Sequence, residues 1–294
     1  MSRSKARVIG LLITVLLIAG GSFWYFKTGR YAVLPAIQPL PTTIYYQDKA
    51  VVLLYHNFGL GETGTTITPR RFSEHLDMLS REGFHVVSLQ DVTQFIEKKK
   101  RLPPNAVAIT MDDGNESNYT VAYPLLKKRN WPATMFVVVS LVNNSGDTSK
   151  GAWMDWSQLA ALTEDNFDIC SHSYDGHKFI KGTYPGGNAW LTSRFPGEDQ
   201  AAYEKRIFDD LVTSREVLKQ HNFNSLDSFC IPFGYYNQSL IDAAQKAGFK
   251  YLWTTEHTPI KVDSPPWRLG RVSVGIGGTS AEKVKEMLIE TGQK

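Results

Sequence analysis

From Val51 onward, short apolar runs alternate with amphipathic stretches, and this alternation constrains the fold more than any other feature of the chain. The apolar runs predict strands at Val51–Tyr55, Val86–Leu89, Ala106–Met111, Met135–Val139, Phe167–Cys170, Ser228–Ile231 and Tyr251–Thr254. The stretches between them predict helices at Arg71–Glu82, Asp91–Lys99, Tyr119–Arg129, Trp156–Thr163, Glu204–Gln220 and Gln238–Ala247. Strand followed by helix, repeated, predicts a parallel sheet with crossover helices, either doubly wound or closed into a barrel.

The N-terminal segment has a different character, because residues 1–50 carry six basic side chains and one acidic side chain. An uncharged run, Val8–Phe26, follows three basic residues and precedes Lys27. Its length as a helix is roughly 28 Å, close to the hydrocarbon thickness of a bilayer. We therefore expect residues 1–26 to be a cytoplasmic stub and a single-pass membrane anchor. A signal peptide cleaved near Ala19–Gly21 is the alternative, and both interpretations place the rest of the chain outside the cytoplasm.

Residues 27–48 contain Pro35, Pro39 and Pro41 and predict a linker, which leaves residues 49–294 as one domain. After residue 50 the chain holds 26 basic and 28 acidic side chains, so a nucleic-acid partner is not expected. No glycine-rich nucleotide motif is present. Two cysteines, Cys170 and Cys230, are too few for a disulfide scaffold, and we expect free thiols although export permits a bond between them. We expect a monomer.

Two adjacent carboxylates, Asp112 and Asp113, end an apolar strand in the segment Thr110–Gly114. The carboxyl ends of parallel strands are where ligands bind in such sheets. Neighbouring side chains on a strand point to opposite faces, so one carboxylate can face a metal while the other, from the turn, faces the reacting group. An N-cap aspartate followed by a turn glycine is the structural alternative.

Two histidines, His172 and His177, follow another predicted strand in the segment Ser171–His177. Imidazoles at this spacing can converge on one ion if the loop bends at Gly176, and imidazole with carboxylate suits zinc or another divalent first-row metal. A third strand ends in Phe229–Gly234, which without the other two segments is an ordinary proline–glycine turn.

Together these segments resemble the polysaccharide deacetylase family (carbohydrate esterase family 4, the NodB homology domain) over about residues 51–274. The family's T-F-D-D-G motif corresponds to Thr110–Gly114, with Met111 in place of phenylalanine. Its H-[ST]-x-x-H motif corresponds to His172–His177, one residue longer, and its R-x-P-[YF]-G motif corresponds to Cys230–Gly234 without the arginine. The opening Val52–His56 and the segment Asn118–Leu126 are similar to the branch that contains bacterial poly-N-acetylglucosamine deacetylases.

The resemblance implies a distorted (β/α) barrel, here preceded by one transmembrane helix. It implies that Asp113, His172 and His177 hold a divalent metal, with zinc expected, and that Asp112 is the general base. The family's C-terminal L-x-H, which supplies the acid, is absent after Arg271–Val274. We therefore assign the acid to His56 through a permuted motif order, with a structural histidine as the alternative.

The activity implied is removal of N-acetyl groups from a cell-surface or exported polysaccharide of N-acetylglucosamine, with the particular polymer left open. The expected substrate contacts are Pro232, Phe233, Gly234, Tyr174 and Trp190. The backbone near Phe233 would supply an oxyanion donor. The aromatic segment 178–205 either lines a glycan cleft or packs on itself.

Two alternatives stay open: a metal-dependent deacylase of small amides, and a catalytically silent glycan-binding module, which is supported by the missing C-terminal histidine and the missing arginine. Arg268 or Arg271, near the last predicted strand, could reach Asp112 in its place, or each could be an ordinary surface side chain.

Overall fold

The computed structural model describes residues 43–143, 152–180 and 188–294, all within one unit of the chain, Pro41–Lys294. The expected anchor, residues 1–26, lies outside the described residues. Within them, no helix combines the length and the apolar character needed to cross a bilayer. Residues 43–48, expected in the linker, belong to the domain instead, since Tyr46 is buried and its hydroxyl donates to the Ala106 carbonyl at 3.1 Å.

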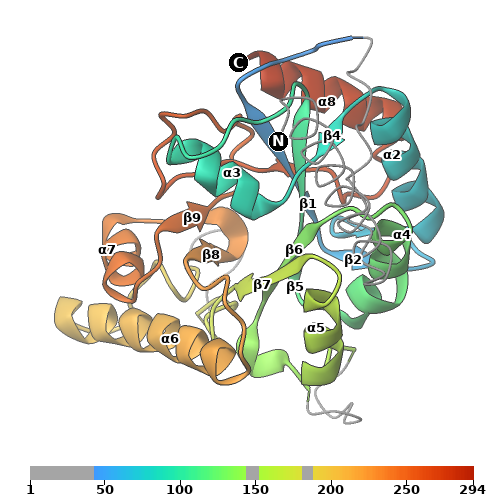
Figure 1. Cartoon of the computed structure of the whole chain (residues 1–294). Coiled ribbons are helices and arrows are strands. Elements are labelled where there is room, and N and C mark those ends of the chain that lie inside the picture. Colours follow the sequence, from blue (N-terminus) through green and yellow to red (C-terminus); the bar gives the residue numbers. More distant parts are fainter. Residues whose placement is uncertain (1–42, 144–151, 181–187) are drawn as a thin grey trace, which may run out of the picture. The chain divides into compact units, whose positions relative to one another are not determined.

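An eight-stranded parallel sheet forms the centre of the domain, in the order β10-β1-β5-β6-β7-β8-β9, with β4 beside the first half of β5 (Figure 1). Its strands are β1 (Ala50–Tyr55), β4 (His85–Val86), β5 (Ala106–Asp113), β6 (Ala133–Val137), β7 (Phe167–Ser171), β8 (Ser228–Cys230), β9 (Tyr251–Trp253) and β10 (Val272–Ser273). A separate parallel pair is formed by β2 (Asn57–Phe58) and β3 (Thr66–Ile67).

The sheet curls into an incomplete barrel because one segment contacts both of its edges. Leu269 bridges Trp253 of β9, and three residues later Val272 pairs with Leu53 of β1. Ala50 of β1 also exchanges two backbone hydrogen bonds with Ile260, at 3.0 and 2.8 Å. This closure agrees with the expected distorted (β/α) barrel and not with the open, doubly wound alternative.

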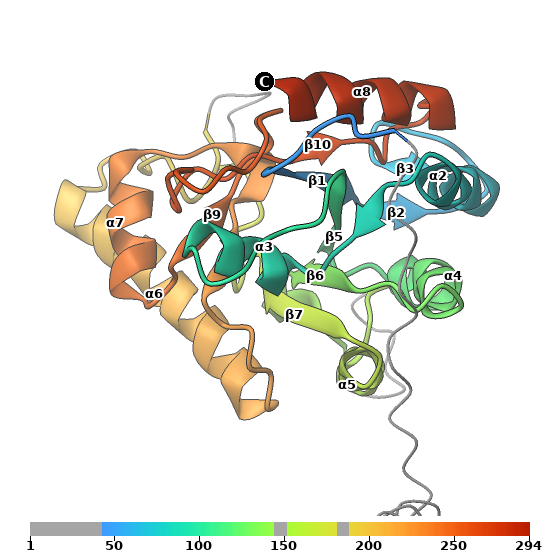
Figure 2. The same cartoon turned by 45° about the horizontal axis from the view of Figure 1, so that its top comes forward.

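Most helices lie on the outer side of the curled sheet, as Figure 2 shows from a second direction, while the helix at Leu89–Ile96 packs against its inner side. The helices are α2 (Pro69–Arg81), α3 (Leu89–Ile96), α4 (Tyr123–Lys127), α5 (Trp156–Thr163), α6 (Gln200–Gln220), α7 (Gln238–Lys246) and α8 (Ala281–Gln293), together with the short helices η1 (Asn118–Ala122), η2 (Val139–Leu141) and η3 (Pro232–Gly234). One large outer core packs α2, α4, α5 and α8 against the strands from β1 to β7. A second outer core packs α6 and α7 against β8 and β9.

Capping explains where the observed helices depart from those expected. The predicted strand Val86–Leu89 ends at Val86, because Ser88 and Asp91 form a capping box that starts α3 at Leu89. Helix α6 starts four residues earlier than expected, because the Asp199 side chain accepts the Ala202 N–H at 2.8 Å. Helix α8 and the β2–β3 pair were not predicted from the sequence.

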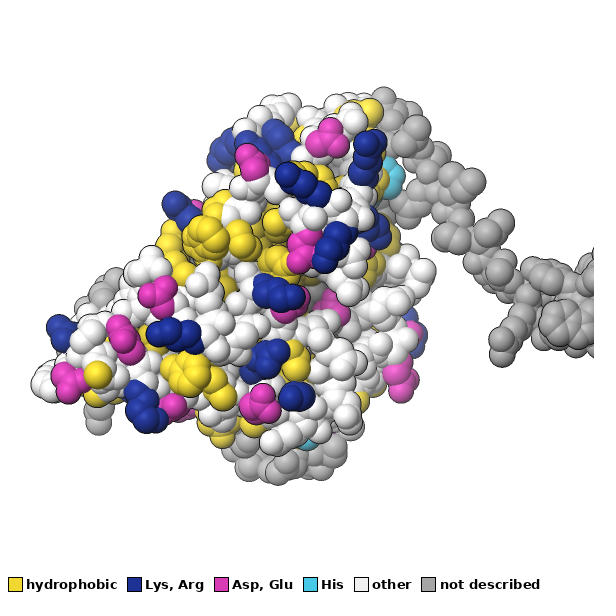
Figure 3. All heavy atoms as spheres, turned by 60° about the vertical axis from the view of Figure 1, so that its left-hand side comes forward, with side chains coloured by type: hydrophobic (Ala, Val, Ile, Leu, Met, Phe, Trp, Pro, Cys, Tyr) yellow, Lys and Arg dark blue, Asp and Glu magenta, His cyan; other side chains and the backbone are white. Residues whose placement is uncertain are grey.

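The inside of the barrel changes from apolar to polar along the strands. Small and aromatic side chains such as Ala108 and Phe136 fill the interior, and the charged pair of Asp112 and Arg271 lies buried toward the carboxyl ends. Outside, acidic and basic side chains are interspersed with small apolar patches over the face brought forward in Figure 3. Inside the barrel, the charged side chains therefore lie at one end, near the carboxyl ends of the strands.

Candidate active site

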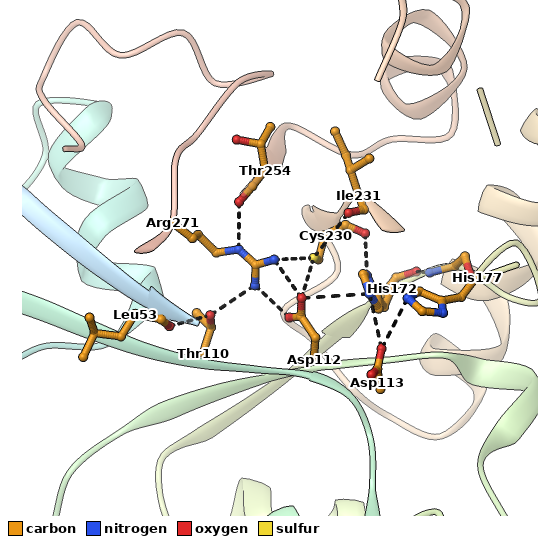
Figure 4. A network of polar contacts seen from close by, with 12 residues as sticks. Leu53, Thr110, Asp112, Asp113, His172, His177, Cys230, Ile231, Thr254 and Arg271 are labelled. Atoms are coloured by element: carbon orange, nitrogen blue, oxygen red, sulfur yellow. Dashed lines mark hydrogen bonds and ion pairs between the residues drawn. The ribbon is translucent and has the colours of Figure 1, made fainter. Parts of the chain in front are cut away.

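Both carboxylates at the end of β5 reach the same site because the backbone turns between them. Asp112 continues the alternation of the strand and points into the barrel, where it is 2% exposed. Asp113 has a φ of +74° and Gly114 a φ of +87°, which breaks the strand geometry. The Asp113 side chain therefore lies near His172 instead of on the outer face of the sheet (Figure 4).

Asp112 is paired with Arg271, which is fully buried beside it. The guanidinium donates to both carboxylate oxygens at 2.7 Å, and it also donates to the Thr254 carbonyl and the Thr110 hydroxyl at 3.1 Å each. Burial raises the pKa of Asp112, but the positive charge of Arg271 opposes it, and the pKa lies well below its ordinary value. Asp112 is therefore ionised at neutral pH.

With the arginine of the third motif absent, Arg271 is the residue that pairs with Asp112. The sequence left Arg268 and Arg271 as equal candidates, and the structure separates them: Arg268 pairs with Glu256 on the surface. Cys230 stands where the third motif has its arginine, and a thiol cannot form an ion pair with a carboxylate. Its Sγ nevertheless lies 3.3 Å from Asp112 Oδ2 and 2.8 Å from an Arg271 nitrogen. Both cysteines are free thiols, as expected.

Asp113, His172 and His177 come together as a possible metal site, with their ligand atoms all within 4.8 Å of one another. The Nε2 atoms of His172 and His177 lie 3.6 and 3.4 Å from Asp113 Oδ1. That oxygen is buried and has no hydrogen-bond partner among the described residues. A buried acceptor between two imidazoles fits a bound cation, and the donor set suits zinc.

The protonation states of the two histidines favour cation binding. Burial lowers the pKa of His172 to about 3 and also lowers that of His177, so both rings are neutral ligands at neutral pH. His172 Nδ1 lies 2.8 Å from the Cys230 carbonyl, which orients Nε2 toward Asp113. Burial raises the pKa of Asp113, as does the neighbouring Asp112 carboxylate.

His56, the expected acid, follows β1 directly. The register pairs Tyr55 with Met111, so His56 lies level with Asp112 on the neighbouring strand. Its field lowers the pKa of both Asp112 and Asp113. The side-chain amide of Asn118 donates to the His56 carbonyl at 2.6 Å and holds this backbone in place. The position suits a proton donor, and the acid role itself stays a prediction.

The third motif forms a tight turn, η3, beside the histidines. Phe233 and Gly234 have φ values of +61° and +75°, and the Phe233 ring centroid lies 4.4 Å from that of His177 and 4.3 Å from that of Phe179. Pro232 begins this turn and is buried. The turn therefore places aromatic surface next to the possible metal ligands, while its contact with substrate stays a prediction.

The two remaining predicted substrate contacts have different surroundings. Tyr174 lies on the loop between the histidines and is partly exposed. The Trp190 ring is covered by Arg206, whose guanidinium lies 4.3 Å from the ring centroid and also donates to the Trp190 carbonyl. This packing corresponds to the alternative in which the described part of the aromatic segment packs on itself.

Comparison with known proteins agrees with this geometry. The family model described as Polysaccharide deacetylase matches residues 99–252, about half of the chain. The poly-beta-1,6-N-acetyl-D-glucosamine N-deacetylase of Staphylococcus epidermidis is 25% identical over 71% of this chain and 68% of its own length. The enzyme of the same name from Escherichia coli (strain K12) is 26% identical over 76% of this chain, and the match spans 35% of that longer protein.

Solved structures show the same fold. The structure of IcaB from Ammonifex degensii superimposes with a TM-score of 0.69 at 25% identity, covering 83% of this chain and 98% of that one. A de-N-acetylase from Aggregatibacter actinomycetemcomitans gives 0.72 at 22% identity, covering 82% of this chain and all of that one. With the family model, the paired carboxylates and the two histidines in agreement, the chain belongs to the polysaccharide deacetylase family.

Proposed function

We propose that this protein is a metal-dependent N-deacetylase that hydrolyses N-acetyl groups of N-acetylglucosamine in a cell-surface or exported polysaccharide. The observation that carries the proposal is the unpartnered, buried Asp113 Oδ1 between His172 and His177, with the ionised Asp112 adjacent. The names of the relatives, which are N-deacetylases of poly-beta-1,6-N-acetyl-D-glucosamine, support the substrate class.

Each of the residues at the site has a different role in the proposed reaction. Asp113, His172 and His177 would hold the ion, for which we expect zinc; when bound, such an ion polarises an amide carbonyl and lowers the pKa of a water molecule. Asp112 accepts a proton from the attacking water, because Arg271 keeps its carboxylate ionised and oriented. His56 gives a proton to the departing amine as the carbon–nitrogen bond breaks and acetate forms.

Arg271 also weakens the case for a silent glycan-binding module, which depended in part on the missing arginine. The buried guanidinium makes two 2.7 Å contacts with the base. An arginine is therefore present beside Asp112 after all, and it comes from the residue directly before β10. No observation favours a deacylase of small amides over the polysaccharide enzyme.

The decisive experiment measures acetate release and bound metal on the same preparations. With poly-β-1,6-N-acetylglucosamine, chitin oligomers and peptidoglycan as substrates, we expect the wild type to release acetate from at least one. Asp112→Asn should lose at least a thousandfold in rate while keeping its metal, because the base is gone and the three ligands remain. His172→Ala should lose both metal and activity.

Asp209→Asn is the matched control, because Asp209 is exposed and pairs with Lys205. It should release acetate at the wild-type rate. Full activity in Asp112→Asn would contradict the role of Asp112 as general base. If the wild type binds glycan without releasing acetate, the protein is a glycan-binding module and not an enzyme.

We also propose that residues 1–26 hold the domain at the outer surface of the cell membrane as a single-pass protein, with secretion after signal cleavage as the alternative. The support is the length and lack of charge of Val8–Phe26 and its basic flanks.

A further inference from the structure

The loop between the two metal-ligating histidines is one residue longer than the family pattern and contains a strained residue. Ser173, directly after His172, has a φ of +98°, a region that side chains other than glycine rarely adopt. Gly176 passes so close to the Leu191 side chain that an added Cβ would lie 2.8 Å from it. Contacts with other parts of the protein are therefore needed to hold the loop in this conformation.

Helix α6 supplies that support through one carboxylate. Asp210 is 7% exposed, and its Oδ1 and Oδ2 accept the backbone N–H groups of Tyr174 at 3.0 Å and Asp175 at 2.8 Å. One turn further along α6, the Ser214 hydroxyl bonds the Ser171 hydroxyl at 2.8 Å. The Ser171 oxygen in turn accepts the Ser173 N–H at 3.2 Å.

The opposite side of the loop is held by the backbone that follows β6. The N–H of Val139 donates to the Ser173 carbonyl at 3.0 Å, and the N–H of Ser140 donates to the Tyr174 carbonyl at 2.8 Å. The loop is therefore fixed from two sides, and Asp210 is the side chain that holds its middle, between His172 and His177.

Asp210 fills this position although burying it is unfavourable. No Lys, Arg or His nitrogen of the described residues comes within ion-pair distance of it. Burial raises the pKa of Asp210 to about 6, although its hydrogen bonds with the two backbone N–H groups lower it. Two N–H groups that point at two separate acceptors require a carboxylate, because an asparagine offers one acceptor and turns an NH₂ group toward the other N–H.

We propose that Asp210 is a positioning residue for the metal centre: by binding the N–H groups of Tyr174 and Asp175, it sets the separation of His172 and His177 so that both face Asp113. This inference rests on the proposed function, because it assigns Asp210 to the same metal site. It adds a residue that lies on a helix, contacts none of the ligands, and belongs to none of the three motifs.

The test measures zinc affinity in the full-length protein without substrate, by competition with a chromophoric chelator. Asp210→Asn keeps the size of the side chain and should bind zinc at least tenfold more weakly than wild type. Asp209→Asn, one residue earlier on the exposed side of α6, should bind zinc as the wild type does. Asp210→Glu keeps a carboxylate and should recover part of the affinity.

Zinc affinity separates positioning from a general structural role, since lost packing alone would lower thermal stability and leave the zinc affinity of the folded protein unchanged. Equal zinc affinity in Asp210→Asn and Asp209→Asn overturns the proposal. If Asp210→Asn does not fold, zinc affinity is measured on Ser214→Ala instead. We expect this variant to bind zinc two- to threefold more weakly than wild type, and an unchanged affinity would contradict the proposal. A wild type that binds no zinc would instead contradict the metal centre itself.

Discussion

At the scale of single residues, the site depends on a buried charge pair. Asp112 and Arg271 are both almost fully buried and make two hydrogen bonds to each other. Breaking a buried pair by removing one partner is costly, because it leaves the other charge without compensation. Arg271 therefore has two effects that can be measured separately: it stabilises the fold, and it keeps Asp112, the proposed base, ionised.

Arg271→Met should lower the free energy of unfolding by about 3–5 kcal/mol and shift the acid limb of the activity profile to higher pH. The sign follows from the causes: burial raises the pKa of Asp112, and without the guanidinium that effect is no longer opposed. Urea unfolding and the pH dependence of kcat/KM check the two effects.

Arg268→Met is the control, because its pair with Glu256 is exposed. The control should cost at most about 1 kcal/mol and leave the pH profile unchanged. An acid limb in Arg271→Met that coincides with that of the wild type would contradict the role assigned to Arg271.

At the scale of elements, the turns after the strands determine how the site is assembled. At the end of β5, two successive positive φ values bring Asp113 to the side of Asp112, and after β8 two successive positive φ values occur within η3. Strand alternation could be predicted from apolar periodicity, and it implied that the two carboxylates do not share one strand face. The sequence assigned the carboxylate of the turn to the reacting group, whereas in the structure that carboxylate, Asp113, lies in the possible metal site. The direction of each turn depends on backbone conformations that periodicity does not encode.

Gly234→Ala should destabilise the η3 turn. Gly234 has a φ of +75°, and a Cβ there would lie 2.2 Å from the Thr255 hydroxyl oxygen. We expect the free energy of unfolding to fall by about 1–3 kcal/mol, measured by urea denaturation. Gly61→Ala serves as the comparison, because nothing lies within 4 Å of its added Cβ, and it should be neutral. Equal stability of the two variants would show that this turn tolerates a side chain.

At the scale of the whole molecule, closure of the barrel gathers residues that lie far apart in the chain. Asp112 and Arg271 are 159 positions apart and meet only because the segment from Leu269 to Val272 joins β9 to β1. The domain that contains both residues is described from residue 43 onward, and it has hydrophobic cores of its own. We therefore expect the site to assemble without the N-terminal segment.

Deleting residues 1–40 should therefore separate location from activity. The full chain should sediment with membranes, because Val8–Phe26 is long and uncharged enough to span the hydrocarbon layer. The shortened protein should stay in the soluble fraction and release acetate at the same kcat. Intact-mass measurement of the full chain distinguishes an anchor from a cleaved signal peptide, and a full chain that keeps residues 1–26 yet does not sediment would contradict anchoring.

Periodicity and motif spacing are local properties of a chain, so the sequence was enough to predict the parallel α/β architecture and the segments that carry Asp112, Asp113, His172 and His177. It could not choose between Arg268 and Arg271, or find Asp210, because nothing local distinguishes a buried arginine or a loop-binding aspartate from a surface residue. Both became visible only in the folded protein, because the curled sheet and its helices show which charges are removed from water and which groups they meet there.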